Sequence, residues 1–163
     1  MNAEAQTSNL RIIVNGALGR MGQEVVAAVA DAPDMTLVCG VDLRAENSHS
    51  LTNGPPIQSD LGRAIETYHP HVIVDFSVAE AALIAAEEAM NRGVAVVIGT
   101  TGLEEGDLLA IGNAAGSNKI GAIVAPNFAI GAVLLIHLAN MVSRYFEYAD
   151  ITLYVQDSQP VLL

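Results

Sequence analysis

Basic residues are scarce in this sequence: seven Lys and Arg stand against eighteen Asp and Glu, for a formal net charge of −11. A surface of that charge repels a nucleic-acid backbone, and no Lys/Arg cluster offsets it, so we expect no nucleic-acid partner. Charged residues of both signs make up only 15% of the 163 residues, whereas hydrophobic residues make up 52%. This balance argues against a disordered chain and predicts a globule that buries a sizeable core.

Cysteine is limited to Cys39, which excludes an internal disulfide and gives no metal-ligand spacing. Cys39 lies in the apolar run TLVCGV, where we interpret it as a small buried hydrophobic residue. The N-terminal stretch MNAEAQTSNL has neither the basic start nor the apolar core of a signal peptide. The longest apolar run, IGAVLLIHLANMV, is too short to span a bilayer. We therefore expect a soluble, cytoplasmic protein with no metal site and no membrane partner.

Six short runs rich in Val and Ile recur without clean alternation, which is typical of strands covered on both faces. These runs are RIIVN (11–15), TLVCGV (36–41), HVIVDF (71–76), VAVVIG (94–99), IGAIVA (120–125) and ITLYV (151–155). Helices are expected between or after them, at 20–32, 60–68, 77–92, 104–115 and 129–146. The alternation predicts a doubly wound, Rossmann-type α/β fold with a mainly parallel sheet of about six strands.

Local signals refine this outline. The polar, turn-rich segment 43–58 is predicted to be a loop, and the pattern Ser77-Val78-Ala79-Glu80 predicts a capping box at the start of a helix. We expect one dinucleotide-binding domain over 1–163, with residues 1–9 flexible and an atypical tail at 156–163.

A glycine-rich turn joins the first predicted strand to the first predicted helix. In VNGALGRMGQEVV, Gly16, Gly19 and Gly22 follow a G-x-x-G-x-x-G spacing. Such a turn brings backbone N–H groups and a helix N-terminus close to a pyrophosphate, which residues with a Cβ would obstruct. The alternative is a helix-entry turn in which the glycines serve packing alone. The position of the turn, first in the chain and between strand and helix, favours dinucleotide binding.

An acidic residue ends the second predicted strand. Asp42, in CGVDLR, is placed to accept hydrogen bonds from both hydroxyls of an adenosine ribose, which favours NAD. Arg44, two residues later, either faces the 2′-phosphate of NADP or is a solvated loop charge. The preference between NADH and NADPH therefore stays open.

Two further loops are expected at the same edge of the sheet. Gly99, Thr100 and Thr101 end the fourth run, and Ala125, Pro126, Asn127 and Phe128 follow the fifth. Their hydroxyl, amide and backbone groups suit a nicotinamide carboxamide. The simpler alternative is that Thr101 and Asn127 only cap the helices that follow.

The motifs GALGRMG, DFS, GTTG and APNFAIG, in this order, resemble the N-terminal domain of the 4-hydroxy-tetrahydrodipicolinate reductase family of lysine and diaminopimelate biosynthesis. The resemblance extends from about Leu10 to Thr152. It implies hydride transfer from NADH or NADPH to a cyclic imine dicarboxylate. It assigns the nicotinamide to Gly99, Thr100, Thr101, Ala125, Pro126, Asn127 and Phe128. It assigns the ribose to Asp42 and the phosphates to Gly16, Ala17, Leu18, Gly19, Arg20 and Met21.

The end of the chain departs from the family. Where the family has Glu-x-His-His and a Lys before Asp-Ala-Pro-Ser-Gly-Thr, this sequence reads VQDSQPVLL. Val155, Asp157, Ser158 and Val161 stand at the positions of the Glu, the His pair and the Lys, and none can donate the proton or hold the substrate carboxylate. We therefore predict no catalytic residue in this chain, a missing substrate domain, and cofactor binding without turnover. The alternative is a non-catalytic nucleotide-binding partner that forms homo- or hetero-oligomers through its last strand.

Overall fold

The described residues of the computed structural model are 9–45, 51, 54–125, 128, 130–146 and 148. They fall into two compact units, residues 1–126 and 127–163, and each is described here by itself. The strands of the first unit are β1 (Leu10–Asn15), β2 (Met35–Val41), β3 (Ile57–Gln58), β4 (Val72–Asp75), β5 (Ala95–Ile98) and β6 (Ala122–Val124). Its helices are α1 (Arg20–Asp31), α2 (Leu61–Tyr68), α3 (Ala79–Asn91) and α4 (Glu105–Asn118).

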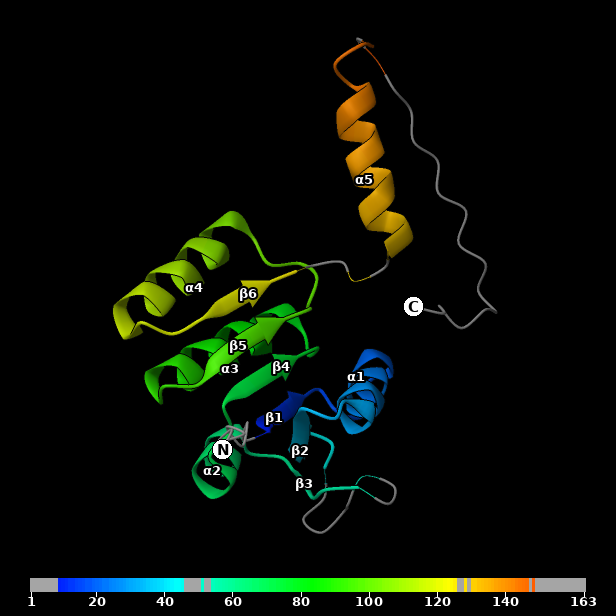
Figure 1. The fold of residues 1–163 in the computed structure, drawn as a ribbon. Helices are drawn as coiled ribbons and strands as arrows, with labels where there is room; N and C mark the ends of the chain where they lie inside the picture. Colours follow the sequence, from blue (N-terminus) through cyan, green and yellow to red (C-terminus); the bar gives the residue numbers. More distant parts are fainter. Residues whose placement is uncertain are drawn as a thin grey trace, which may run out of the picture. The chain divides into compact units, whose positions relative to one another are not determined.

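The six strands form one sheet in the order β3-β2-β1-β4-β5-β6, with every pair parallel (Figure 1). The chain leaves β1 toward β3 on one side and then returns to build β4 to β6 on the other. The strand order therefore reverses between β1 and β4, and ligands of such sheets bind outside the carboxyl ends of the strands at this point. The predicted Rossmann-type α/β class is confirmed.

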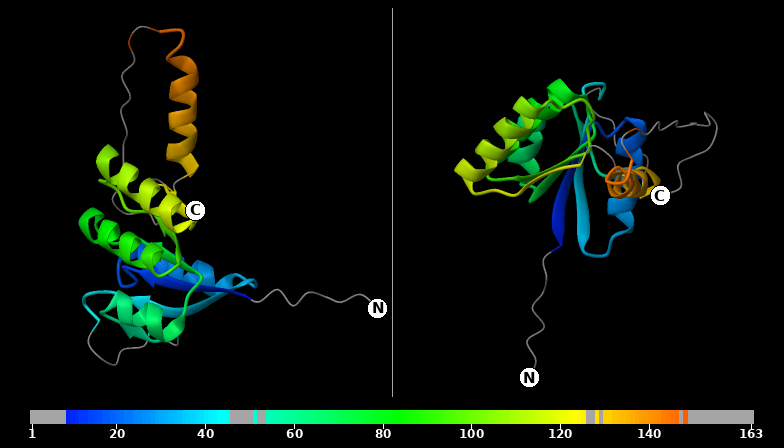
Figure 2. Two further views of the ribbon diagram at one scale, coloured as in Figure 1. Left: turned by 90° about the vertical axis from the view of Figure 1, so that its left-hand side faces the viewer. Right: turned by 90° about the horizontal axis from the view of Figure 1, so that it is seen from above.

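Helices cover both faces of the sheet. Helix α1 lies on one face, and α2, α3 and α4 lie on the other, as the view from above shows for α1, α3 and α4 (Figure 2). The core under α1 includes Ile12 and Val14, whereas the core under the other helices includes Ile13 and Ile73. Neighbouring residues of β1 thus enter opposite cores, because successive side chains of a strand point to opposite faces. This explains why the strands read as continuous apolar runs.

Helix α3 packs closely on the sheet because its buried side is made of small residues. Ala82, Ala85, Ala86 and Ala89 are all buried, and Met90 fills the space at the end of the helix. Alanine brings the helix axis near the strands and has the highest helix propensity. The carboxyl ends of β4 and β5 are thereby held against a rigid element.

Two local predictions were wrong. Segment 43–58 is not loop throughout, because Ile57 and Gln58 form β3 and pair with Gly40 and Val41 of β2. The predicted capping box at Ser77 does not form either. Helix α3 is capped at Val78 without a side-chain hydrogen bond, while the Ser77 hydroxyl donates to Asp75. A competing acceptor in the tertiary structure therefore takes the capping group away from the helix.

The second unit contains α5 (Ile130–Val142), which carries no charged residue and none of whose residues is buried. The predicted strand 151–155, the tail 156–163 and residues 1–8 of the predicted flexible segment lie outside the described residues. No helix within the described ranges is both long enough and apolar enough to cross a membrane. In the same ranges, no group of His, Cys, Asp and Glu side chains is arranged to hold a metal ion.

Candidate functional site

The glycine turn between β1 and α1 lies at the reversal of strand order. Gly16 and Ala17 donate their N–H groups to the carbonyl oxygen of Val41, at 2.8 and 3.1 Å. Gly16 has a φ of +76°, and a Cβ built on it would lie 2.9 Å from the carbonyl carbon of Phe76. Glycine is thus required at this position by conformation and by space. The turn is consequently pressed between the ends of β2 and β4.

Helix α1 starts directly from this turn. Gly19 is its N-cap residue and donates its N–H to the Gly16 carbonyl at 2.9 Å. A Cβ on Gly22 would overlap the Gly16 carbonyl group, so a glycine there allows the first helical turn to pack against the loop. Because the free N–H groups of a helix start attract anions, the absence of side chains leaves a cradle that fits a pyrophosphate.

The other residues of the predicted phosphate loop differ in exposure. Ala17 is fully buried, Leu18 and Gly19 are partly buried, and Arg20 and Met21 are exposed. Arg20 is the first residue of α1, so its positive charge lies at the edge of the turn. These positions agree with a loop that presents backbone to a ligand while its alanine anchors it in the core.

Asp42 joins this turn to the end of β2. It is only 7% exposed, and its Oδ2 accepts the Leu18 N–H at 3.0 Å. Arg44 donates its backbone N–H to Oδ1 at 3.0 Å, and its Nε and Nη2 to Oδ1 and Oδ2 at 2.9 Å each. The hydrogen bonds from the Arg44 side chain, helped by the two N–H groups, lower the pKa of Asp42 below its ordinary value. Asp42 is therefore an anion at neutral pH.

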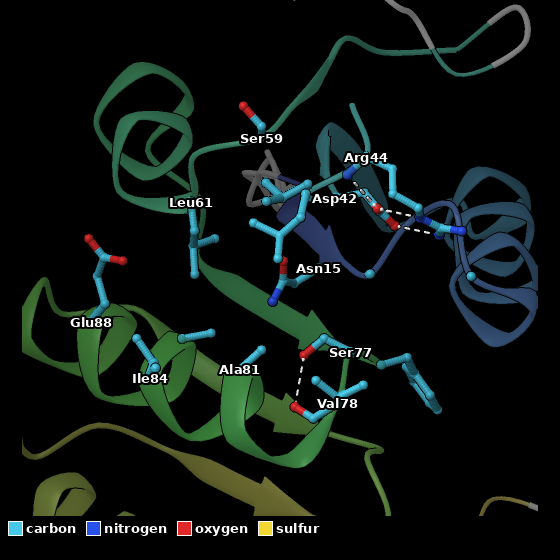
Figure 3. A pocket seen from close by; sticks show the side chains of 16 residues that line it. Asn15, Asp42, Arg44, Ser59, Leu61, Ser77, Val78, Ala81, Ile84 and Glu88 are labelled. Carbon is cyan, nitrogen blue, oxygen red and sulfur yellow. Dashed lines mark hydrogen bonds and ion pairs between the residues drawn. The ribbon is translucent and has the colours of Figure 1, made fainter. Parts of the chain in front are cut away.

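A cavity of about 640 Å³ opens beside Asp42. Figure 3 shows Ala81, Ile84 and Glu88 of α3 along one side of it and Asp42 with Arg44 across from them. Three large aliphatic side chains of its lining are strongly exposed, Leu43 at 86%, Val78 at 69% and Ile84 at 64%. Gly16 and Gly19 line it as well. Gly16 and Gly19 of the predicted phosphate loop thus share one cavity with Asp42, and Leu43, Val78 and Ile84 make part of its wall apolar.

The loop after β5 lies beside the loop after β4. A Cβ on Gly99 would overlap the Phe76 ring, so the ring packs on the backbone of this glycine. Thr100 is buried, and its hydroxyl lies 3.3 Å from Oδ1 of Asp75 and 3.2 Å from the Ser77 carbonyl oxygen. Thr101 is exposed. Thr101 does not cap α4, because Glu104 is the N-cap residue and forms a capping box with Asp107.

The last predicted group of site residues is divided. Ala125 follows β6 and donates its N–H to the Ile98 carbonyl at 2.9 Å. Pro126 and Asn127 lie outside the described residues, and Phe128 belongs to the second unit. The role of these residues around a nicotinamide stays a prediction.

Sequence reasoning missed the part played by Asn15 and Asp75. Asp75, the last residue of β4, is 2% exposed and accepts hydrogen bonds from Asn15, Ser77 and Thr100. The signal available in the sequence was an aspartate ending an apolar strand run. Its partners are as many as 60 residues away in the chain.

The fold and this geometry define a class: a Rossmann-type nucleotide-binding domain, with a glycine turn after the first strand and a carboxylate ending the second. A family model described as "Dihydrodipicolinate reductase, N-terminus" matches residues 10–128. The chain belongs to the dihydrodipicolinate reductase family, as its motifs indicated, and corresponds to the family's N-terminal portion.

Curated relatives agree with this family. The 4-hydroxy-tetrahydrodipicolinate reductase of Moorella thermoacetica is 41% identical over 150 residues, which cover 88% of this chain and 56% of that protein. A protein of the same name from Dehalococcoides mccartyi is 39% identical over 146 residues, covering 87% and 56%. The chain therefore spans about half the length of the curated relatives it matches.

Solved structures give the same fold. Dipicolinate-bound dihydrodipicolinate reductase from Paenisporosarcina sp. TG-14 is similar with a TM-score of 0.73 and 32% identity, over 85% of this chain and 55% of that one. The WlbA dehydrogenase from Chromobactrium violaceum, solved with NADH and UDP-GlcNAcA, is 17% identical with a TM-score of 0.69, over 85% and 41%. The second likeness supports the fold alone.

Proposed function

We propose that this chain binds a reduced nicotinamide dinucleotide across the carboxyl ends of β1, β2 and β4. The observation that carries the proposal is the hydrogen bond from the Leu18 N–H to Asp42, which fixes the glycine turn and the ribose carboxylate as one unit. A diphosphate would bind the N–H groups of the turn, and the adenosine ribose would bind Asp42. The apolar rim of Leu43, Val78 and Ile84 suits the flat faces of an adenine ring.

Both NADH and NADPH would be accepted, because Asp42 and Arg44 offer two recognition groups at one place. The Asp42 carboxylate would accept hydrogen bonds from the two hydroxyls of the NADH ribose. These bonds would replace the ones that it accepts from the Arg44 side chain. The Arg44 side chain is 66% exposed, so it can turn toward a 2′-phosphate without leaving a packed environment. Its guanidinium would then hold that phosphate by charge-assisted hydrogen bonds.

The activity of the full-length relatives is proposed for the complete protein: reduction of the cyclic imine of 4-hydroxy-tetrahydrodipicolinate by hydride transfer. The dinucleotide supplies the hydride, and the substrate would be an imine dicarboxylate. Support for separating binding from turnover comes from coverage, since the chain spans 56% of the Moorella relative. We infer that the 163-residue chain by itself holds the dinucleotide without reducing the imine.

A fluorescence titration of the 163-residue chain with NADH and with NADPH tests this function. We expect saturable binding of both, together with no loss of absorbance at 340 nm when the imine is added. If only one dinucleotide binds at up to millimolar concentration, the proposal that the chain accepts both NADH and NADPH is wrong. If neither binds, the proposal of dinucleotide binding is wrong. Steady oxidation of the dinucleotide by the isolated chain would reject the separation of binding from turnover.

A second candidate function is that of a nucleotide-binding partner that associates with other chains, and α5 favours it. Seven of its apolar side chains are more than two fifths exposed, namely Ile130, Val133, Leu134, Ile136, Leu138, Met141 and Val142. The second unit by itself leaves this apolar surface uncovered, and the second candidate function requires that another chain covers it. Sedimentation equilibrium should then show oligomers at micromolar concentration, and a strictly monomeric species would contradict this role.

A further inference from the structure

Asp75 accepts hydrogen bonds from three separate segments at the carboxyl edge of the sheet. Its Oδ2 accepts Nδ2 of Asn15 at 2.5 Å, from the end of β1. Its Oδ1 accepts the N–H and the hydroxyl of Ser77, at 2.9 and 2.7 Å, from the loop before α3. The hydroxyl of Thr100, after β5, lies 3.3 Å from the same oxygen. A single buried carboxylate therefore joins the ends of β1, β4 and β5.

Each hydrogen bond that the Asp75 side chain makes with the described residues is one that it accepts, and this arrangement suits a carboxylate. An ionised carboxylate only accepts hydrogen bonds, so both of its oxygens suit the four donor groups. An amide of the same shape has one oxygen and one NH2 group. In one orientation its NH2 would face Nδ2 of Asn15, and in the other it would face Ser77 and Thr100. With its neighbours in their present orientations, asparagine at position 75 leaves at least one donor unpaired, and Asn15 would have to turn its amide over to pair with the new NH2 group.

The hydrogen bonds that hold the glycine turn and Asp42 do not involve Asp75, although Asn15 and Ser77 line the same cavity as Asp42. The glycine turn is held by the bonds from Gly16 and Ala17 to Val41 and by the bond from Leu18 to Asp42. Val41 ends β2 and Asp42 follows it directly, on the other side of β1 from β4. Asp42 and Asp75 thus each fix the loops on one side of the reversal in strand order.

The topology assigns the two halves of a dinucleotide to these two sides. With the diphosphate on the turn after β1 and the ribose on Asp42, just after β2, the nicotinamide would extend over the ends of β4 and β5. The loops there carry Phe76, Ser77, Gly99 and Thr100, and Asp75 holds two of these residues directly. The Gly99 N–H also donates to the Asp75 carbonyl at 2.8 Å, so the β5 loop is joined to the same residue by main chain.

Resting on the proposed function, we propose that Asp75 is a positioning residue for the nicotinamide half of the cofactor: by joining Asn15, Ser77 and Thr100, it shapes the surface on which that ring lies. It acts through these residues and does not touch the cofactor itself. A carboxylate that merely supported the fold would affect every ligand of the domain alike. A positioning role affects only ligands that carry the nicotinamide.

The test is the substitution Asp75→Asn in the 163-residue chain, with binding of NADH and of ADP-ribose measured by calorimetry. ADP-ribose contains the adenosine and the diphosphate but lacks the nicotinamide ring. We expect NADH to bind about tenfold more weakly, since the substituted side chain would hold Asn15, Ser77 and Thr100 less firmly, and ADP-ribose to bind as in the wild type. At saturating NADH, the enhanced emission of the bound nicotinamide should fall toward that of free NADH.

Two further variants make the result decisive. Asp34→Asn removes the same charge at an exposed position and should bind both ligands as the wild type does. Ser77→Ala removes the hydroxyl that donates to Asp75 at 2.7 Å, and should weaken NADH binding severalfold while leaving ADP-ribose unchanged. If Asp75→Asn does not fold, Ser77→Ala is judged by the same criterion.

The proposal is overturned if Asp75→Asn, or the second variant where Asp75→Asn does not fold, binds NADH like the wild type. It is also overturned if that variant loses affinity for NADH and for ADP-ribose to the same extent. Failure of the proposed function gives a different result, because the wild-type chain itself would then bind neither NADH nor NADPH. That outcome would remove the basis of the positioning role as well.

Discussion

The ion pair between Asp42 and Arg44 is the residue-scale feature with the clearest consequence for cofactor choice. Replacing Arg44 with methionine keeps an unbranched apolar stem but removes the charge and the donors of the guanidinium. We expect Arg44→Met to bind NADPH about tenfold or more weakly, because a charge-assisted bond to the 2′-phosphate is lost, and NADH at least as tightly as the wild type. Parallel titrations with the two dinucleotides measure the change.

Arg63 provides the matched control for this comparison, because it is exposed on α2 and does not line the cavity. Arg63→Met should change neither affinity. Equal weakening of NADH and NADPH in Arg44→Met would show that Arg44 shapes the loop without recognising the phosphate.

The same ion pair should make stability depend on pH in a defined direction. The pKa of Asp42 is lowered in the folded chain, mainly by hydrogen bonds from Arg44. The ionised carboxylate therefore stabilises the fold above the ordinary carboxyl pKa of about 4, and this contribution is lost as the pH falls through the lowered value. In Arg44→Met most of the contribution is absent at every pH.

Urea denaturation at pH 7, 5 and 3 should show this dependence. The difference in free energy of unfolding between wild type and Arg44→Met is expected to be largest at pH 7 and to shrink toward pH 3. A difference that stayed constant over this range would mean that Arg44 stabilises the chain by packing and not through the charge of Asp42.

At the scale of single elements, α4 depends on its N-terminal cap. The helix contains Gly106, Gly112 and Gly116, which lower helix propensity, and Ile111 is its only buried residue. Asp107 accepts the Glu104 N–H at 2.9 Å and so completes the capping box. We expect Asp107→Ala to lower the free energy of unfolding by about 1 kcal/mol and to speed hydrogen exchange in the first turn.

Glu105→Ala is the control for the cap, since it removes the same charge from the same helical turn. It should cost only the smaller interaction with the helix dipole. If Asp107→Ala and Glu105→Ala lower the free energy of unfolding equally, the hydrogen bond from the Glu104 N–H to Asp107 adds nothing to the effect of the Asp107 charge.

Secondary elements were predictable to the extent that they have a repeating pattern. The runs at β1, β2, β4, β5 and β6 and the five helices carry such patterns, and their predicted ranges overlap the observed ones. Strand β3 has two residues, too few for any periodicity, and exists because it pairs with β2. Ser77 has the sequence of a capping residue, yet a carboxylate two residues earlier binds its hydroxyl more closely. Both errors arise from partners that a local pattern does not contain.

At the scale of the whole molecule, the rate at which Cys39 reacts with a thiol reagent measures how often the core opens. It is fully buried in the core under α2, α3 and α4, and burial raises the pKa of its thiol to about 11. Because thiolate is the reactive form, we expect a thiol reagent at pH 8 to label the folded chain very slowly. The chain unfolded in urea should be labelled at the rate of an ordinary exposed thiol.

Saturating NADH should slow the labelling of the folded chain further if it binds only the folded state. Mass spectrometry of samples quenched at intervals gives the rate with and without the dinucleotide. Rapid labelling of the native chain would contradict the burial of Cys39 in this core.

Local patterns in the sequence were enough to predict the fold class, the family and the residues proposed for the adenosine half of the site. Apolar runs, a glycine spacing and an aspartate at a strand end are local features, and neighbouring residues suffice to create them. The tertiary structure alone decided which groups meet at the other end of the site. Asn15, Asp75 and Thr100 lie far apart in the chain, and only the parallel pairing of β1, β4 and β5 places their side chains within hydrogen-bonding distance. Because a buried carboxylate is stable only where donors surround it, its role could be read only after those strands were aligned.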